Sequence, residues 1–203
     1  MKQSEIREEE EVSPVEDLMR EHGLLERVLL IYDEVLRRLG ALQPIPADVL
    51  PTAAGMVRRF VEDYHEKLEE EFVFPCFEKA GKLVDLVAVL RTQHQRGRRL
   101  TDQILRLGTA AALRNESDRR QLAETLRQFN RMYRPHAARE DTVLFPPFRG
   151  LVGAKEYDAL GELFEDRERE LFGNGGFEKM VAEVAKMERV LGIYELNAFT
   201  PEK

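Results

Sequence analysis

Apolar residues recur at intervals of three and four along most of the chain, which is the spacing of a helix that buries one face. The pattern begins after Ser13, where Pro14 at the first helical position and Glu16 three residues after the serine are typical of a helix start. It predicts a first helix over residues 13–40. A second helix with the same apolar spacing is predicted to end at Pro75.

Four further helical patterns follow, separated by short polar or glycine-containing connections. They are predicted over residues 83–107, 118–145, 154–171 and 177–191, the second of them closed by Pro146-Pro147. The sequence has no credible strand pattern of alternating apolar and polar residues, which excludes parallel-sheet and sandwich folds. Long helices joined by short connections predict an all-α protein: an antiparallel four-helix bundle plus two C-terminal helices.

The chain is expected to have three parts. Residues 1–12 are predicted to be a flexible acidic N-terminus, because neighbouring like charges resist folding. Residues 13–149 form the predicted bundle. Residues 150–203 form a C-terminal helical extension, which either caps the bundle or makes a subunit contact in a homo-oligomer.

Composition narrows the classes of partner. The 203 residues include 31 Lys and Arg against 38 Asp and Glu, a net charge of −7, so the basic surface of a nucleic-acid-binding protein is missing. The single cysteine, Cys76, excludes an internal disulfide and fits a reducing compartment. No apolar stretch has the length of a signal peptide or a membrane span. We therefore expect a cytoplasmic protein with neither nucleic acid nor membrane as a partner.

A duplicated motif carries the candidate chemistry. The segment from His65 to Phe77 aligns with the segment from His136 to Phe148 at an offset of 71 residues, with the shared pattern H-x-x-x-E-[E/D]-x-x-x-F-P-x-F. The other two histidines, His22 and His94, are 72 residues apart. All four histidines therefore fall into two matched pairs, which predicts a bundle with an internal two-fold pseudo-repeat.

Residues four apart project from the same face of a helix, so each H-x-x-x-E pair offers two metal-binding groups together. The two lone histidines complete the set on the other two helices. The predicted metal ligands are His22, His65, Glu69, His94, His136 and Glu140. The alternative is a buried polar network of the same histidines without a cation, which would need every group to find a hydrogen-bond partner.

The ligand types favour iron. Imidazole suits Zn, Fe, Cu and Ni, whereas carboxylates suit harder ions and can bridge two of them. Six ligands exceed what one tetrahedral zinc ion needs, and the chain has no cysteine cluster for a structural zinc site. Two iron ions bridged by Glu69 and Glu140 use every group and leave positions open for a small molecule. Mn and Zn are the alternative metals.

At these residues the sequence resembles the hemerythrin family, specifically the HHE cation-binding domain, whose H-x-x-x-E helices end in Phe-Pro. The resemblance extends from about Val15 to Phe148. It implies a non-haem di-iron centre, bridged by carboxylates and by an oxo or hydroxo group, that binds, senses or detoxifies O2, NO or peroxide. The alternatives are a catalase- or peroxidase-like enzyme or iron-centre repair at the same site, and, apart from the family, a structural bundle without metal.

Some positions differ from related proteins. The resemblance implies that oxygen carriers have a second histidine where this chain has Arg98, and a carboxylate ligand where it has Asp141 beside Glu140. Repair proteins usually add an N-terminal cysteine-bearing segment, which this sequence lacks. Glu26 and Arg98 each follow a lone histidine by four residues, so we expect them to form a salt bridge across the bundle or to contact the site. The acids expected to support the ligands or face solvent are Glu66, Glu70 and Asp141.

Overall fold

The computed structural model describes residues 12–201, so the flexible terminus expected over residues 1–12 lies outside the described part apart from Val12. Within residues 12–201 the regular elements are all helical, which confirms the all-α class. The α-helices are α1 (Pro14–Gly40), α2 (Val49–Met56), α3 (Glu66–Leu68), α4 (Phe74–Ala80), α5 (Val84–Leu107), α6 (Glu116–Arg139), α7 (Phe145–Val152), α8 (Ala154–Phe172) and α9 (Gly176–Leu191). Short 3₁₀ turns lie at Ala112–Arg114 and Leu196–Phe199.

Three π-helical segments join some of these helices into longer rods. Val57–His65 and Glu69–Val73 connect α2, α3 and α4, so residues 49–80 form one continuous helical segment. Glu140–Leu144 connects α6 to α7, so residues 116–152 form another. We refer to these rods as the second and fourth helical segments, with α1 as the first and α5 as the third.

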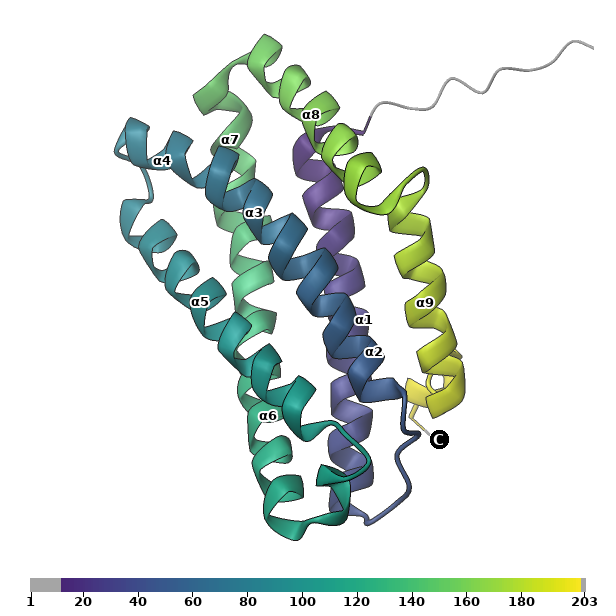
Figure 1. The fold of residues 1–203 in the computed structure, drawn as a ribbon. Coiled ribbons are helices and arrows are strands. Elements are labelled where there is room, and N and C mark those ends of the chain that lie inside the picture. The colour runs from purple at the N-terminus through teal and green to yellow at the C-terminus, as the bar shows by residue number, and fades with distance from the viewer. Residues whose placement is uncertain (1–11, 202–203) are drawn as a thin grey trace, which may run out of the picture.

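The four long segments pack around one hydrophobic core (Figure 1). The first contacts the second and the fourth, and α5 contacts the second and the fourth in turn. Buried aromatic side chains from several segments fill the interior, among them Tyr32, Phe60 and Phe129, each with no exposed surface. Ser13 caps the first helix by accepting a hydrogen bond from the Glu16 N–H, as predicted.

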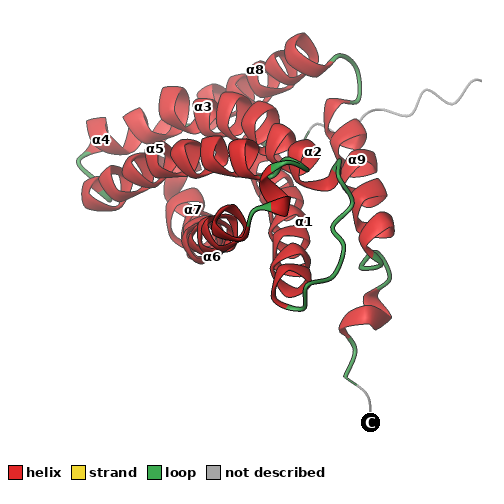
Figure 2. Ribbon diagram, turned by 60° about the horizontal axis from the view of Figure 1, so that its bottom comes forward, coloured by secondary structure: helices red, strands yellow, loops and turns green. Residues whose placement is uncertain are grey.

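The two C-terminal helices cover one side of the bundle. Helix α9 packs along α1 and α2, and α8 crosses over α1 and α7 (Figures 1 and 2). Arg27 on α1 donates hydrogen bonds of 2.9 and 2.5 Å to the Glu188 carboxylate on α9, which ties the last helix to the first. The predicted boundary between residues 149 and 150 falls within α7.

The predicted helix ends at Pro75 and at Pro146-Pro147 are wrong. Both helices continue, to Ala80 and to Val152, because each proline follows a π-helical segment and lies in the first turn of the next α-helix. At that position the N–H that proline lacks costs little stability. The carbonyl of Glu70 instead accepts a hydrogen bond of 3.3 Å from the Arg91 guanidinium.

Among residues 12–201, no helix is both long and apolar enough to cross a bilayer.

Candidate metal centre

The six side chains predicted as metal ligands come together inside the bundle. Each of the four long segments contributes one histidine, and the second and fourth also contribute one glutamate each. All six are buried, with at most 6% of any residue exposed. We call this group the histidine centre; it comprises His22, His65, Glu69, His94, His136 and Glu140.

Glu69 lies between two histidines from different segments. Its Oε2 is 3.6 Å from Nε2 of His65, four residues earlier on the same rod, and 3.4 Å from Nε2 of His94 on α5. The H-x-x-x-E spacing therefore brings its two groups together, and the fold adds a histidine from a neighbouring helix.

Glu140 has the equivalent surroundings in the other half. Its Oε2 is 3.1 Å from Nε2 of His136 on the same rod and 3.4 Å from Nε2 of His22 on α1. The contacts of the first motif thus recur at the second, with the same atoms facing inward. Each carboxylate is placed to connect a pair of imidazoles.

The imidazole nitrogens also approach each other in pairs. Nε2 of His22 is 3.0 Å from Nε2 of His65, and Nε2 of His94 is 3.3 Å from Nε2 of His136. Two overlapping sets of ligand atoms result, each compact enough to surround a cation. One set contains His22, His65 and Glu69; the other contains Glu69, His94, His136 and Glu140.

The second nitrogen of each imidazole points away from the centre and faces a hydrogen-bond acceptor. All four acceptors are side-chain oxygens, so each Nδ1 carries a proton and donates it outward. The four pairs are His22 with Asp141 at 2.7 Å, His65 with Glu21 at 2.6 Å, His94 with Glu70 at 3.1 Å, and His136 with Gln93 at 2.9 Å.

This arrangement fits metal ions. A neutral imidazole with its proton on Nδ1 has only a lone pair on Nε2, so two Nε2 atoms about 3 Å apart repel unless a cation or a proton lies between them. Both oxygens of Glu69 and both of Glu140 are buried with no hydrogen-bond partner among the described residues. Buried polar atoms without partners are costly, and a cation between them would remove that cost.

The pKa shifts of the two buried carboxyls also favour a bound cation. Burial raises the pKa of Glu69 well above its ordinary value, and the charge of Glu140 adds to this. Burial also acts to raise the pKa of Glu140, but the neighbouring His136 and His22 outweigh it and hold that pKa well below its ordinary value. Burial lowers the pKa of His94 to about 4. Without metal, the centre therefore keeps one carboxyl protonated where a cation would replace the proton.

The Phe-Pro part of the motif closes the centre to water. The ring of Phe145 stacks on His22 with centroids 5.6 Å apart, and the ring of Phe74 stacks on His94 with centroids 5.4 Å apart. Both phenylalanines begin the α-helix that follows a π-helical segment. The duplicated sequence thus places one aromatic wall on each lone histidine.

Both candidate bridging glutamates are the first residues of π-helical segments, Glu69–Val73 and Glu140–Leu144. The carbonyl of Glu69 accepts its hydrogen bond from the N–H of Phe74, five residues later, and the carbonyl of Glu140 does the same with Phe145. Such wide turns are frequent at functional sites. Here each turn joins a carboxylate of the centre to the aromatic wall that shields it.

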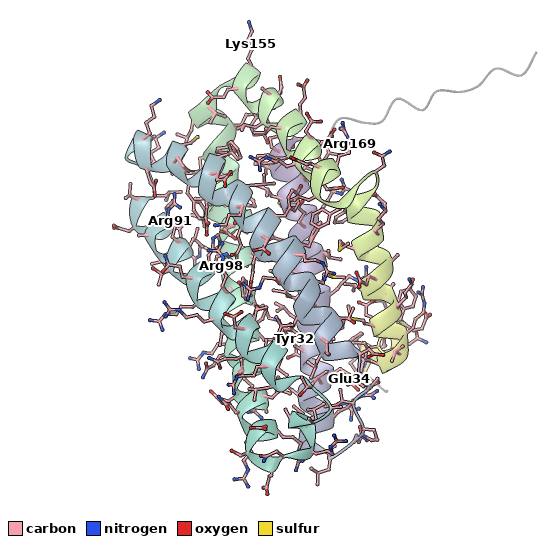
Figure 3. The ribbon with its side chains drawn as sticks, in the orientation of Figure 1. Tyr32, Glu34, Arg91, Arg98, Lys155 and Arg169 are labelled. Atoms are coloured by element: carbon pink, nitrogen blue, oxygen red, sulfur yellow. The ribbon has the colours of Figure 1, made fainter. Side chains whose placement is uncertain are left out.

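The predicted salt bridge between Glu26 and Arg98 is wrong. Arg98 projects from α5 toward the second segment (Figure 3), where its guanidinium lies 2.8 Å from Glu66 Oε2 and 2.7 Å from Glu70 Oε1. Glu26 pairs instead with Arg134 at 3.2 Å. Glu26 and Arg98 hold equivalent positions in the two halves but have different partners, because the acids that face Arg98 lie on the second segment.

The three supporting acids have distinct positions. Asp141 and Glu70 accept from outward-facing imidazoles, as given above, whereas Glu66 accepts a hydrogen bond of 2.8 Å from the Tyr133 hydroxyl. Sequence reasoning missed two further partners, Glu21 and Gln93. Glu21 directly precedes His22, and Gln93 directly precedes His94. A polar residue before each lone histidine was therefore the signal that could have identified these two partners.

A family model described as the hemerythrin HHE cation binding domain matches residues 13–146 and 85–191. The first match covers most of the chain and contains the whole histidine centre, so the chain belongs to this family, which confirms the resemblance. It is accordingly a cation-binding protein, and iron is the metal typical of the family.

The relatives found are mycobacterial. The chain is 53% identical over 190 residues to the "Uncharacterized protein Mb2018" of Mycobacterium bovis and, to the same extent, to the "Uncharacterized protein Rv1995" of Mycobacterium tuberculosis. The alignment covers 94% of this chain and 74% of each relative. No solved structure matches the chain significantly.

Proposed function

We propose that the histidine centre holds two iron ions and that the protein binds, senses or detoxifies O2, NO or peroxide there. The observation that carries the proposal is the inward orientation of four Nε2 atoms around four carboxylate oxygens that are buried without partners. Glu69 and Glu140 would help to hold both ions, since each contacts imidazoles from two different helical segments. When bound, the iron pair would supply open coordination positions and redox chemistry to a small molecule.

The protein's own residues restrict what reaches the centre. His94 and both glutamates have no exposed surface, and Phe74 and Phe145 cover the lone histidines. A molecule must pass between packed side chains, which favours diatomic gases and peroxide over larger substrates. The outward hydrogen bonds of the four Nδ1 atoms fix the imidazole orientations and increase their basicity as ligands.

The metal content of variants tests the ligand assignment. His65→Ala and Glu69→Ala are each expected to lower the iron content of protein purified without added metal, as measured by elemental analysis, and His22→Ala to lower it less. Gln95→Ala is the control, because Gln95 is exposed next to His94. Unchanged iron stoichiometry in all three variants would overturn the assignment.

Optical spectra test the small-molecule role. Iron-loaded protein is expected to give a distinct absorption change under O2 or NO that the His65→Ala variant lacks. Sustained consumption of peroxide without a stable spectral change would favour an enzyme instead. Spectra that are identical with and without each gas and with peroxide would exclude binding of these molecules.

A further inference from the structure

A second cluster of potential ligands lies outside the histidine centre, where α1 meets α8. One carboxylate oxygen from each of Asp17, Glu21 and Glu168 lies within 4.8 Å of the other two. Oxygens on opposite sides of a divalent ion are about 4–5 Å apart, since their bonds to the ion are about 2.0–2.6 Å long. The three acids are therefore spaced as they would be around one cation.

The innermost acid has an oxygen that lacks a partner. Glu21 is only 2% exposed, and its Oε1 has no hydrogen-bond partner among the described residues. Asp17 is 7% exposed, and its nearest cation is the Arg20 guanidinium, 3.6 Å away and beyond hydrogen-bonding distance. Burial, together with the charges of Glu21 and Glu168, raises the pKa of Asp17 to about 7. Among the described residues, Glu168 has no basic side chain within ion-pair distance, Asp17 has only Arg20, and Glu21 has only His65.

The cluster opens to the surface. A cavity of about 630 Å³ is lined by the acids Asp17, Glu165 and Glu168 and also by Arg20 and Arg169, the latter near the turn from α8 to α9 (Figure 3). Glu168 Oε1 accepts a hydrogen bond of 3.0 Å from the Phe177 N–H, which fixes the carboxylate and leaves Oε2 for an ion. An ion in the cavity therefore meets carboxylates held in place by the fold.

One acid of the cluster also contacts the histidine centre. The Oε2 of Glu21 accepts the hydrogen bond from His65 Nδ1 at 2.6 Å, so the same carboxylate touches the cluster and a ligand of the histidine centre. We propose that Asp17, Glu21 and Glu168 form a separate divalent-cation site, which binds an ion from the surface cavity before it passes to the histidine centre. Oxygen ligands suit hard ions such as Fe²⁺, Mn²⁺ and Mg²⁺. Passage of the ion to the histidine centre rests on the proposed function, whereas binding of an ion at the three acids does not.

Tb³⁺ is a suitable probe, because it prefers oxygen ligands and emits when a nearby tyrosine is excited. Tyr64 is that tyrosine: its hydroxyl lies 3.5 Å from the carbonyl of Phe164, one turn before Glu168 on α8, and burial and the charges of the three acids raise its pKa. In protein whose histidine centre is already loaded, Tb³⁺ is expected to give strong tyrosine-sensitised emission. Tyr64→Phe should remove most of the emission while calorimetry still detects Tb³⁺ binding.

Two variants test the acids, with one matched control. Glu168→Gln keeps the acceptor for the Phe177 N–H and, like Asp17→Asn, is expected to weaken Tb³⁺ binding by about tenfold or more, since affinity follows the number of charged ligands. Glu165→Gln lines the same cavity outside the cluster and should change affinity less than about twofold. Equal affinity and emission in the wild type, Glu168→Gln and Asp17→Asn would overturn the site.

Loading kinetics test the passage of ions. Metal-free Glu168→Gln protein is expected to take up Co²⁺ about tenfold more slowly than the wild type while reaching the same final absorbance. Equal rates would overturn the role in passage. If the histidine centre binds no Co²⁺ at all, the proposed function fails, and the Tb³⁺ titration still decides whether the acidic site exists.

Discussion

Among the glycines, Gly97 on α5 has the least room for an added methyl group. A Cβ there would lie 1.9 Å from the hydroxyl oxygen of Tyr133 and 2.7 Å from its Cζ. Tyr133 cannot easily move, because it is 1% exposed and packed against Phe129 with ring centroids 4.4 Å apart. The absence of a side chain at residue 97 therefore allows Tyr133 to reach Glu66.

Gly97→Ala is expected to lower the free energy of unfolding by about 1–5 kcal/mol. Overpacking costs about 1–3 kcal/mol, and loss of the hydrogen bond from Tyr133 to the buried Glu66 costs about 1–3 kcal/mol more. The better helix propensity of alanine returns about 1 kcal/mol. Urea denaturation followed by circular dichroism, with a chelator present, measures the change without the contribution of metal binding.

Two further variants separate the contact from the backbone effect. Gly23→Ala on α1 meets nothing within 4 Å, so it should raise stability by up to about 1 kcal/mol. In a Tyr133→Phe background, which lacks the hydroxyl, Gly97→Ala should cost at least about 1 kcal/mol less than in the wild type. The reasoning is refuted if Gly97→Ala is as stable as the wild type, or if its cost is the same in both backgrounds.

Two other variants test electrostatic contributions to stability. Burial and the charge of Glu21 raise the pKa of Asp17 from 3.8 to about 7, so the folded protein loses stability as the pH rises through that range. Asp17→Asn should therefore increase the free energy of unfolding by about 2–4 kcal/mol at pH 8 and by less than about 1 kcal/mol at pH 4. Urea denaturation in the presence of a chelator measures both values. Arg27→Ala leaves the Glu188 carboxylate, 5% exposed, without its partner and should cost about 1–3 kcal/mol, with faster proteolysis at residues 173–175 because α9 is held less tightly. Unaltered pH dependence in the first case, or unaltered cleavage in the second, would contradict these expectations.

The long helices were predictable because their signals are local. Apolar spacing and the Ser13 cap fix the first helix, and the duplicated motif identifies the candidate ligands before any contact between helices is known. The motif predicts only that His65 and Glu69 share a helix face. That His94 arrives from α5 at the same carboxylate follows from helix packing, which the spacing within one helix does not contain.

The errors came from treating every helix as a regular α-helix. Pro75 was predicted to end a helix because the π-helical segment before it leaves no mark in the apolar spacing. The partner of Arg98 was mistaken for a related reason. Equivalent positions in a duplicated sequence were expected to pair, but the Arg98 guanidinium lies against Glu66 and Glu70. Glu66 has no acidic counterpart in the other half, where the aligned residue is Ala137.

The same comparison of halves leads to a last prediction, about the order in which metal ions bind. The outward partner of His65 is the carboxylate of Glu21, whereas that of His136 is the neutral amide of Gln93. A carboxylate partner makes an imidazole a stronger ligand, and changing such a partner typically alters metal affinity by about 10–100-fold. The ion beside His65 should therefore bind more tightly than the ion beside His136, in two separate steps.

Gln93→Glu should raise the affinity of the weaker step by about tenfold or more and bring the two steps together. Calorimetric titration of metal-free protein with Co²⁺ resolves the steps. Gln95→Glu is the matched control: it adds the same charge two residues away at an exposed position, so it should leave the steps apart. Two steps of equal affinity in the wild type, or an equal effect of both variants, would show that the amide and the carboxylate do not distinguish the two ions.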